Sequence, residues 1–195
     1  MGNEIEKELE IIQQMIQNTK KRAMDSGNIL IMWGLLFIVA MIFMQILQNT
    51  ISTKRLTIYF WVFPVVGLIL TLILKSKKRE KKKLKTYADK IVGAIWLACG
   101  FSLATIKIVF IVSSHNIEFI FTASIFFVII GIGMIISGYV YQWSILKLVG
   151  LFWWLGAILI QLLPQNYLPM VFLNQLGLGL IVPGLIANHL NKKEG

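Results

Sequence analysis

Long apolar runs alternate with short polar stretches along the chain. A helix needs about 20 mostly apolar residues to cross the hydrocarbon core of a membrane. Six segments meet this requirement, at residues 29–47, 57–74, 91–112, 117–139, 144–163 and 168–187. Because lipid offers no hydrogen bonds to the backbone, we expect helices here despite the many β-branched Ile and Val residues. The pattern predicts an all-α fold, a polytopic transmembrane bundle of six helices.

The predicted loops are short, in particular those at residues 113–116, 140–143 and 164–167. Short loops force neighbouring helices to run antiparallel and to touch. Glycine-containing motifs recur in alternate helices, VVGLIL, IIGIGM and QLGLGL in the even ones and MWG, WLACG and WWLG in the odd ones. This recurrence suggests three helix hairpins in series. The expected organisation is an N-terminal helical arm, a transmembrane domain and a short tail, over residues 1–28, 29–190 and 191–195.

Composition agrees with a lipid environment. Hydrophobic residues make up 57% of the 195 residues and charged residues only 14%, whereas a soluble domain carries about 25% charged residues. The charges gather at the two ends and around residues 75–90. Cys99 is the single cysteine of the sequence, so no internal disulfide can form. We expect its thiol to pack as a small hydrophobic side chain.

The distribution of positive charge predicts the orientation. Lys and Arg in short loops are retained on the cytoplasmic side of membrane proteins. With a cytoplasmic N-terminus, all 19 basic residues lie inside except Lys54, Arg55 and Lys107. We therefore expect a multi-pass protein of the bacterial inner (plasma) membrane, with the N-terminus and the C-terminus both in the cytoplasm.

The most basic segment is KSKKREKKKLK, between the second and third predicted helices. Its first role is to fix the topology. A compatible second role is contact with anionic lipid headgroups, to which each basic residue contributes about 1 kcal/mol near the surface. The residues expected to make that contact are Lys75, Lys77, Lys78, Arg79, Lys81, Lys82, Lys83 and Lys85. Nucleic acid is not an expected partner, because no aromatic residues for base stacking are interleaved with the charges.

Residues 5–23 show an amphipathic pattern. Ile5, Leu9, Ile12 and Ile16 recur at spacings of four, three and four residues, which places them on one stripe of a helix, close to a heptad seam. Glutamates load the first turns and basic residues the last, as the helix macrodipole favours. The stripe either lies on the membrane surface or the inner loops, or it mediates formation of a homo-oligomer or binding of a protein partner.

Polar residues inside lipid are costly and therefore informative. Lys107 is the only charge well inside a predicted span, five residues before the end of that span. Its long stem can reach the outer interface by snorkelling. Alternatively, its ammonium pairs with Glu118 beside His115 in an outer polar cluster. His115 and Glu118 alone are too few ligands for a metal site.

The last predicted helix carries the strongest candidate site. Asn174 and Gln175 lie near its middle, Gly177 and Gly179 follow, and Pro183 is expected to kink it. These residues either line a path for a ligand, or the amides hydrogen-bond between helices and hold the bundle together. We also expect close helix contacts at six glycines, where a missing side chain lets backbones approach. They are Gly131, Gly133, Gly138, Gly177, Gly179 and Gly184.

The stretch IIQQMIQNTKKRAMDSGNILIMWGLLF combines an amphipathic arm, basic residues and the pair Trp33 and Gly34. In this it resembles the opening of small uncharacterised bacterial integral membrane proteins. The six-helix, hairpin-repeat layout is also similar to that of small bacterial stress-associated membrane proteins. These resemblances imply a membrane fold but no defined activity, and no site residue is carried over from them.

No catalytic residue, metal or cofactor is predicted. The sequence offers no nucleophile beside a base, no phosphate-binding glycine loop and no metal-ligand spacing. The expected function is that of a non-enzymatic accessory or regulatory membrane protein, acting through its helix surfaces and cytoplasmic arm. The alternative is a small transporter or channel with a polar path at the last helix. A membrane enzyme that acts on lipid is the third candidate.

Overall fold

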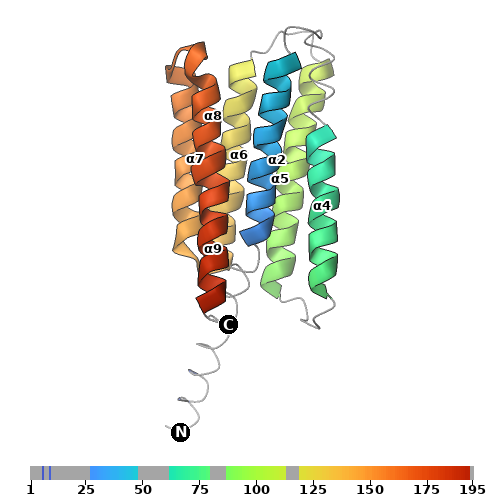
Figure 1. Cartoon of the computed structure of the whole chain (residues 1–195), viewed down its shortest axis with the longest axis vertical. Helices are drawn as coiled ribbons and strands as arrows, with labels where there is room; N and C mark the ends of the chain where they lie inside the picture. Colours follow the sequence, from blue (N-terminus) through green and yellow to red (C-terminus); the bar gives the residue numbers. More distant parts are fainter. Residues whose placement is uncertain are drawn as a thin grey trace.

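Six helical rods, without a strand, make up the part of the chain that the computed structural model describes. That part comprises residues 27–47, 62–79, 87–112 and 119–193, together with Glu6 and Leu9. The rods run up and down along the long axis of the molecule (Figure 1). The first five are α2 (Gly27–Leu47), α4 (Val62–Arg79), α5 (Tyr87–Val112), α6 (Phe119–Val140) and α7 (Ser144–Leu162).

The sixth rod is a composite of several elements. A 3-10 turn, η1 (Gln165–Tyr167), leads into α8 (Leu168–Leu176). The rod then passes through a π-helical segment, η2 (Gly177–Ile181), and continues as α9 (Val182–Lys193). The all-helical prediction is therefore confirmed for the described residues, and the last predicted helix contains a change of helix type.

Five of the rods are long and apolar enough to cross a membrane, namely α2, α5, α6, α7 and the composite rod. The apolar part of α4, Val62–Leu74, is shorter. Residues 57–61, where the sequence predicts the start of that span, lie outside the described residues. The length and composition of the five long rods indicate a membrane protein.

Three helices extend beyond their apolar segments. α4 continues through the basic residues to Arg79, α5 begins at Tyr87, and α9 ends at Lys193. Asp89 lies in the first turn of α5, and Lys192 and Lys193 lie in the last turn of α9. Such charges stabilise helix ends by about 0.3–1 kcal/mol each through the helix dipole. Apolar content alone therefore places the helix ends too far inward.

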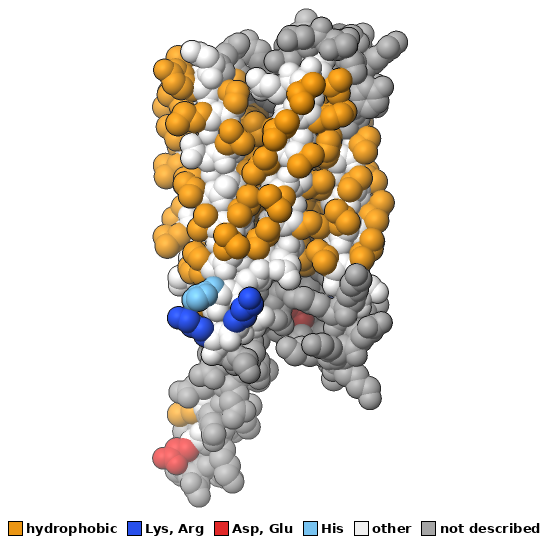
Figure 2. Space-filling model, viewed as in Figure 1, with side chains coloured by type: hydrophobic (Ala, Val, Ile, Leu, Met, Phe, Trp, Pro, Cys, Tyr) orange, Lys and Arg blue, Asp and Glu red, His pale blue; other side chains and the backbone are white. Residues whose placement is uncertain are grey.

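The face of the bundle seen in Figure 2 is apolar over most of the length of its described helices. Large hydrophobic side chains such as Phe101 and Leu162 are 70% and 73% exposed. A soluble monomer rarely exposes contiguous apolar patches larger than a few hundred Å². A surface of this kind is suited to lipid rather than to water.

α6 and α7 form the most extensive helix pair. Two glycines allow their backbones to approach. A Cβ built on Gly131 would lie 2.9 Å from the carbonyl oxygen of Gly150, and one built on Gly150 would lie 2.7 Å from the carbonyl oxygen of Gly131. Removing side chains at a crossing is a common way for helices to pack closely in membranes.

The turn between α6 and α7 reverses the chain within three residues. The N–H of Trp143 donates to the carbonyl of Gly138 at 2.9 Å, and the N–H of Gln142 donates to that of Tyr139 at 3.2 Å. This pair of bonds is the Schellman motif, whose left-handed position usually holds glycine. Here that position is Gln142, with φ at 53°. Trp143 follows it and is buried.

α2 packs against the last rod. A Cβ on Gly27 would lie 2.6 Å from the carbonyl oxygen of Gly184, and one on Gly184 would lie 2.8 Å from that of Gly27. At the same end, the Asn188 amide donates to Oδ1 of Asn28 at 2.6 Å. These contacts join the first long rod to the last.

The two helices of each predicted hairpin are in contact. α2 contacts α4, α5 contacts α6, and α7 contacts α8. Trp33, for example, donates its indole N–H to Oγ1 of Thr71 at 3.0 Å and so links α2 to α4. The α6–α7 pair and the α2–α9 pair, however, cross the boundaries of those hairpins. The arrangement is that of one interconnected bundle.

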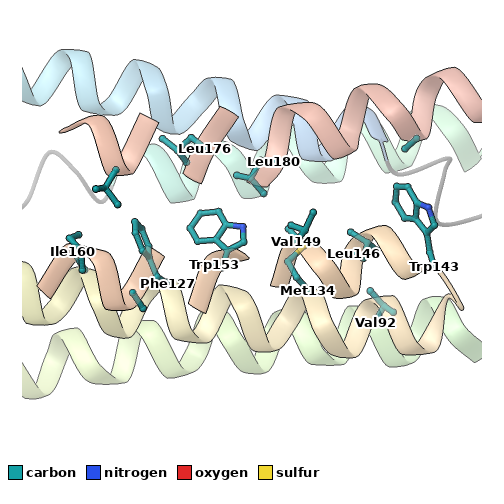
Figure 3. Close-up of a cluster of buried hydrophobic side chains, with 14 of the residues drawn as sticks. Val92, Phe127, Met134, Trp143, Leu146, Val149, Trp153, Ile160, Leu176 and Leu180 are labelled. Atoms are coloured by element: carbon teal, nitrogen blue, oxygen red, sulfur yellow. The ribbon is translucent and has the colours of Figure 1, made fainter. Parts of the chain in front are cut away.

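The core lies between α6, α7 and the last rod. Figure 3 shows Trp153 beside Phe127 and directed toward the rod that carries Leu176 and Leu180. The rings of Trp153 and Phe127 meet edge to face, with centroids 5.1 Å apart. Phe127 meets Phe172 of α8 in the same way, at 4.9 Å. Such aromatic pairs contribute about 0.5–1.5 kcal/mol each beyond the area that they bury.

Candidate functional site in the last rod

Pro183 explains why the last rod changes helix type. Proline has no N–H, so Pro183 cannot donate to the carbonyl of Gly179 four residues earlier. The helix widens just before it, and the N–H of Val182 donates to the carbonyl of Gly177, five residues away. Single π-helical turns inside α-helices occur frequently at functional sites. The π-helical segment is therefore a candidate location for a functional site.

The carbonyl oxygen of Gly179 accepts a hydrogen bond from another helix. Trp153 of α7 donates its indole N–H to this oxygen at 3.4 Å. A side chain at residue 179 would prevent the contact, because a Cβ there would lie 2.6 Å from Nε1 of Trp153. Within hydrocarbon an unpaired backbone group costs several kcal/mol. The hydrogen bond therefore depends on three residues. Pro183 leaves the Gly179 carbonyl without its α-helical donor, Gly179 has no side chain to block the indole, and Trp153 donates the hydrogen bond.

Gln175 fills the space between α7 and α8. Its side chain is 2% exposed and its Nε2 donates to the carbonyl of Phe152 at 3.1 Å. The side chain lies directly over Gly156, where a Cβ would overlap its amide. Its Oε1 is buried without a hydrogen-bond partner among the described residues. A buried acceptor in that state costs about 1–3 kcal/mol.

Asn174 lies on a different side of α8 from Gln175. Successive side chains on a helix point about 100° apart, and while Gln175 is buried, Asn174 is exposed. Gly177 is half-buried, and a Cβ built on it would meet nothing within 4 Å. The four predicted site residues are therefore divided. Gln175 and Gly179 face α7, whereas Asn174 and Gly177 lie toward the outside.

The expectation of close contacts at glycines is correct at most of the six positions. A Cβ on Gly138 would lie 2.8 Å from the backbone nitrogen of Lys147, and one on Gly133 would lie 3.3 Å from Sγ of Cys99. Gly131, Gly179 and Gly184 are closely packed as described above. Within the described part of the chain Gly177 makes no such contact, because the helix surface is open there.

Sequence reasoning missed Trp153 and Gly156 as parts of the site. Both belong to the motif WWLG, which also contains Trp154. Trp154 donates its indole N–H to the carbonyl of Val128 in α6 at 3.2 Å. An indole in the middle of a membrane helix needs an acceptor, and the available acceptors are on neighbouring helices. That need is the signal in the sequence from which these contacts could have been predicted.

The other predicted sites lie largely outside the described residues. Lys107 is half-buried in α5, but His115 and Glu118 are not described, so the outer polar cluster stays a prediction. Residues 75–79 form the last turns of α4, while residues 80–86 are not described. Of the arm, only Glu6 and Leu9 are described, both of them helical and exposed. Contact of these segments with lipid or protein stays a prediction as well.

The described cations at helix ends collect at one end of the bundle. Lys90 lies in the first turn of α5, Lys147 in the first turn of α7, and Lys192 and Lys193 in the last turn of α9. The up-and-down course of the rods brings these ends together at the lower end in Figure 1, and Figure 2 shows Lys and His side chains below the apolar band. Nζ of Lys147 lies 4.1 Å from the ring centroid of Tyr139.

Comparison with protein-family models, curated proteins and solved structures finds no match for the chain. Its class therefore follows from its own features. The described residues are helical, five of the rods have the length and apolarity of membrane spans, and the exposed surface between the helix ends is apolar. In length and composition, these features indicate a helical membrane protein.

Proposed function

We propose that this protein is a non-enzymatic accessory or regulatory protein of a membrane, which acts through its outward-facing helix surfaces and its N-terminal arm. The filled interior is the observation that carries the proposal. Trp153, Phe127, Met134, Ile160 and Gln175 are fully buried. Close packing of this kind leaves the outer surfaces as the places where a partner can bind.

The proposed setting is the bacterial inner membrane, with six spans and both termini in the cytoplasm. The collection of Lys90, Lys147, Lys192 and Lys193 at one end supports this orientation, because basic residues are retained on the cytoplasmic side. The same end would contact anionic lipid headgroups, with the residues of the basic run KSKKREKKKLK adding to the attraction.

Cysteine labelling tests the orientation. In a Cys99→Ala background, Ser52→Cys and Asn116→Cys should react with a membrane-impermeant maleimide added to intact cells. Thr86→Cys should react only after the membrane is opened. Labelling of Thr86→Cys from outside, with Ser52→Cys and Asn116→Cys protected, would show that the proposed orientation is inverted.

The role of Gln175 separates the proposal from its main alternative. Gln175→Leu keeps most of the side-chain volume while it removes the hydrogen bond to Phe152 and the unpaired Oε1. If Gln175 only packs, the variant should fold with a stability equal to or above that of the wild type. The loss of one interhelical bond costs about 0.6 kcal/mol in a membrane, which the removal of the unpaired acceptor offsets.

A small transporter or channel is the second candidate function. The unpaired Oε1 of Gln175 beside the π-helical segment favours it, because transporters build their sites at discontinuous helices. The test is flux into proteoliposomes that hold the purified full-length chain, measured with alkali cations, protons and small polar solutes. Flux that is lost in a folded Gln175→Leu variant would establish the transporter and overturn the accessory role.

The accessory role makes a direct prediction in cells. Photo-crosslinking residues placed at exposed positions on α5 and α4, such as Phe101 and Leu72, should capture one defined membrane protein at one face. Placed at the buried Ile160, the same probe should capture nothing and serves as the matched control. Equal, low capture at all three positions would argue against a partner on these surfaces.

A further inference from the structure

Asn174 presents an amide at a depth where lipid tails are expected. Six residues separate it from the start of α8, which corresponds to about 9 Å along the helix. The other exposed Asn and Gln residues of the described part lie in turns or within one turn of a helix end. They are Asn28, Gln45, Gln142, Gln161 and Asn166. Among the described residues, Asn174 is therefore the exposed amide that lies farthest from an end of its rod.

An amide at this depth needs a partner. It carries two N–H donors and a carbonyl acceptor, and burying such groups in hydrocarbon without hydrogen bonds is costly. Exposed hydroxyls such as those of Ser102 and Thr105 can bond to the carbonyl four residues earlier in their own helix. The amide of Asn174 has no hydrogen bond within the part of the chain that the structure describes, which leaves it available to a group on another molecule.

The surface around Asn174 has the form of a helix-packing face. Met170, Asn174, Gly177 and Leu178 recur at spacings of four, three and one residues and lie on one side of the rod. Met170 is 63% and Leu178 is 52% exposed. Nothing lies within 4 Å of a Cβ built on Gly177, so another helix can approach the backbone there. A polar side chain beside a small residue is typical of helix interfaces in membranes.

A second copy of the chain fits this face. Copies that insert into one membrane share their orientation, so residue 174 lies at the same depth in each of them. A two-fold axis along the membrane normal then brings the same residue of both copies together. An amide is its own complement, because the N–H of each side chain can donate to the carbonyl oxygen of the other. A different protein would need a polar group at that same depth.

We propose that the face formed by Met170, Asn174, Gly177 and Leu178, which we call the Asn174 face, binds a second copy of this chain in a parallel, symmetric dimer. The proposal rests on the membrane placement in the proposed function and specifies one of the outward surfaces. It does not involve the N-terminal arm, for which the sequence offers self-association as a separate alternative.

Disulfide trapping tests the Asn174 face in native membranes with the full-length chain. In the Cys99→Ala background, Asn174→Cys should form a cross-linked dimer in the presence of copper phenanthroline, and Met170→Cys and Leu178→Cys should form it as well. Thr105→Cys is the matched control, since residue 105 is exposed and lies seven residues from the end of α5 at the same end of the bundle. We expect the Asn174→Cys yield to exceed that of the control at least fivefold.

The fraction of dimer in liposomes gives a second readout that does not depend on cysteine. Asn174→Leu should weaken dimerisation at least tenfold, as measured by single-molecule photobleaching, whereas Asn174→Gln should retain it. An Asn174→Cys yield equal to that of Thr105→Cys, or an unchanged dimer fraction in Asn174→Leu, would overturn the proposal. A cross-link from Asn174→Cys to a different protein would overturn it as well.

Failure of the dimer can be distinguished from failure of the proposed function. A protein that resists carbonate extraction and shows the expected maleimide labelling, but does not cross-link through the Asn174 face, contradicts only the dimer. A protein that carbonate extracts from the membrane contradicts both.

Discussion

Replacing Gly150 with alanine should destabilise the bundle, because it forces apart the two helices that pack most closely. The added Cβ would lie 2.7 Å from the carbonyl oxygen of Gly131 and 3.0 Å from the backbone nitrogen of Ile135, whereas ordinary contact begins at 3.4 Å. Both of these atoms belong to the backbone of α6. No side-chain rotation relieves the overlap, so α6 and α7 have to separate.

The cost follows from that separation. A gap of about 0.5–1 Å forfeits roughly a quarter to a half of the dispersion energy of each atom pair across the interface. Overpacking of a close contact costs about 1–3 kcal/mol in total. The higher helix propensity of alanine offsets about 0.5–1 kcal/mol of this cost. We therefore expect Gly150→Ala to lower the free energy of unfolding by about 1–2 kcal/mol.

The measurement is unfolding in mixed micelles with increasing sodium dodecyl sulfate, followed by tryptophan fluorescence and circular dichroism. Gly100→Ala in α5 is the matched control, since a Cβ at Gly100 meets nothing within 4 Å. The control should unfold at the wild-type midpoint or slightly above it. If Gly150→Ala and Gly100→Ala unfold at the same midpoint, α6 and α7 do not cross at their glycines, and the packing described here is incorrect.

Two further predictions concern the hydrogen bond from α7 and the turn before it. Trp153→Phe removes the donor to the Gly179 carbonyl and should cost about 0.6 kcal/mol. That cost should shrink in a Pro183→Ala background, where residue 183 supplies an N–H, and a double-mutant cycle of unfolding free energies measures the coupling. Additive costs would contradict it. Gln142→Gly should stabilise the protein by about 1 kcal/mol, because residue 142 has φ at 53° and a left-handed conformation is unfavourable for residues with a side chain. Gln142→Ala keeps that penalty and should bring no gain in the thermal unfolding midpoint, so equal gains in both variants would refute the explanation.

The helices themselves could be predicted because lipid imposes a simple rule. A segment of sufficient apolar length has to satisfy its own backbone, which leaves helix as the structure. The same rule says little about helix contacts. The crossing of Gly131 and Gly150 depends on two residues that meet only once the chain has turned, and that turn places Gln142 where glycine is usual. Residue type indicated a close contact at Gly131, but neither residue type nor spacing indicated Gly150 as its partner.

The candidate site shows a sharper limit. Asn174 and Gln175 are adjacent and chemically alike, so the sequence alone could not decide which of them faces the core. The π-helical segment rotates α8 relative to α9 by about one residue position, since its hydrogen bonds span five residues instead of four. An α-helical periodicity carried across Gly177–Ile181 therefore gives the wrong face. Pro183 signals an interruption but not the size of the rotation.

The contact between Gly27 and Gly184 has a consequence for biosynthesis. Translation at about 5–20 residues per second separates the emergence of these two residues by roughly 8–30 seconds. During that interval α2 has left the ribosome without the surface that later covers Gly27 and Asn28. Until α9 is made, lipid or the insertion machinery has to cover this surface of α2. A ribosome that stalls before α9 would leave an orphaned helix for membrane proteases to recognise.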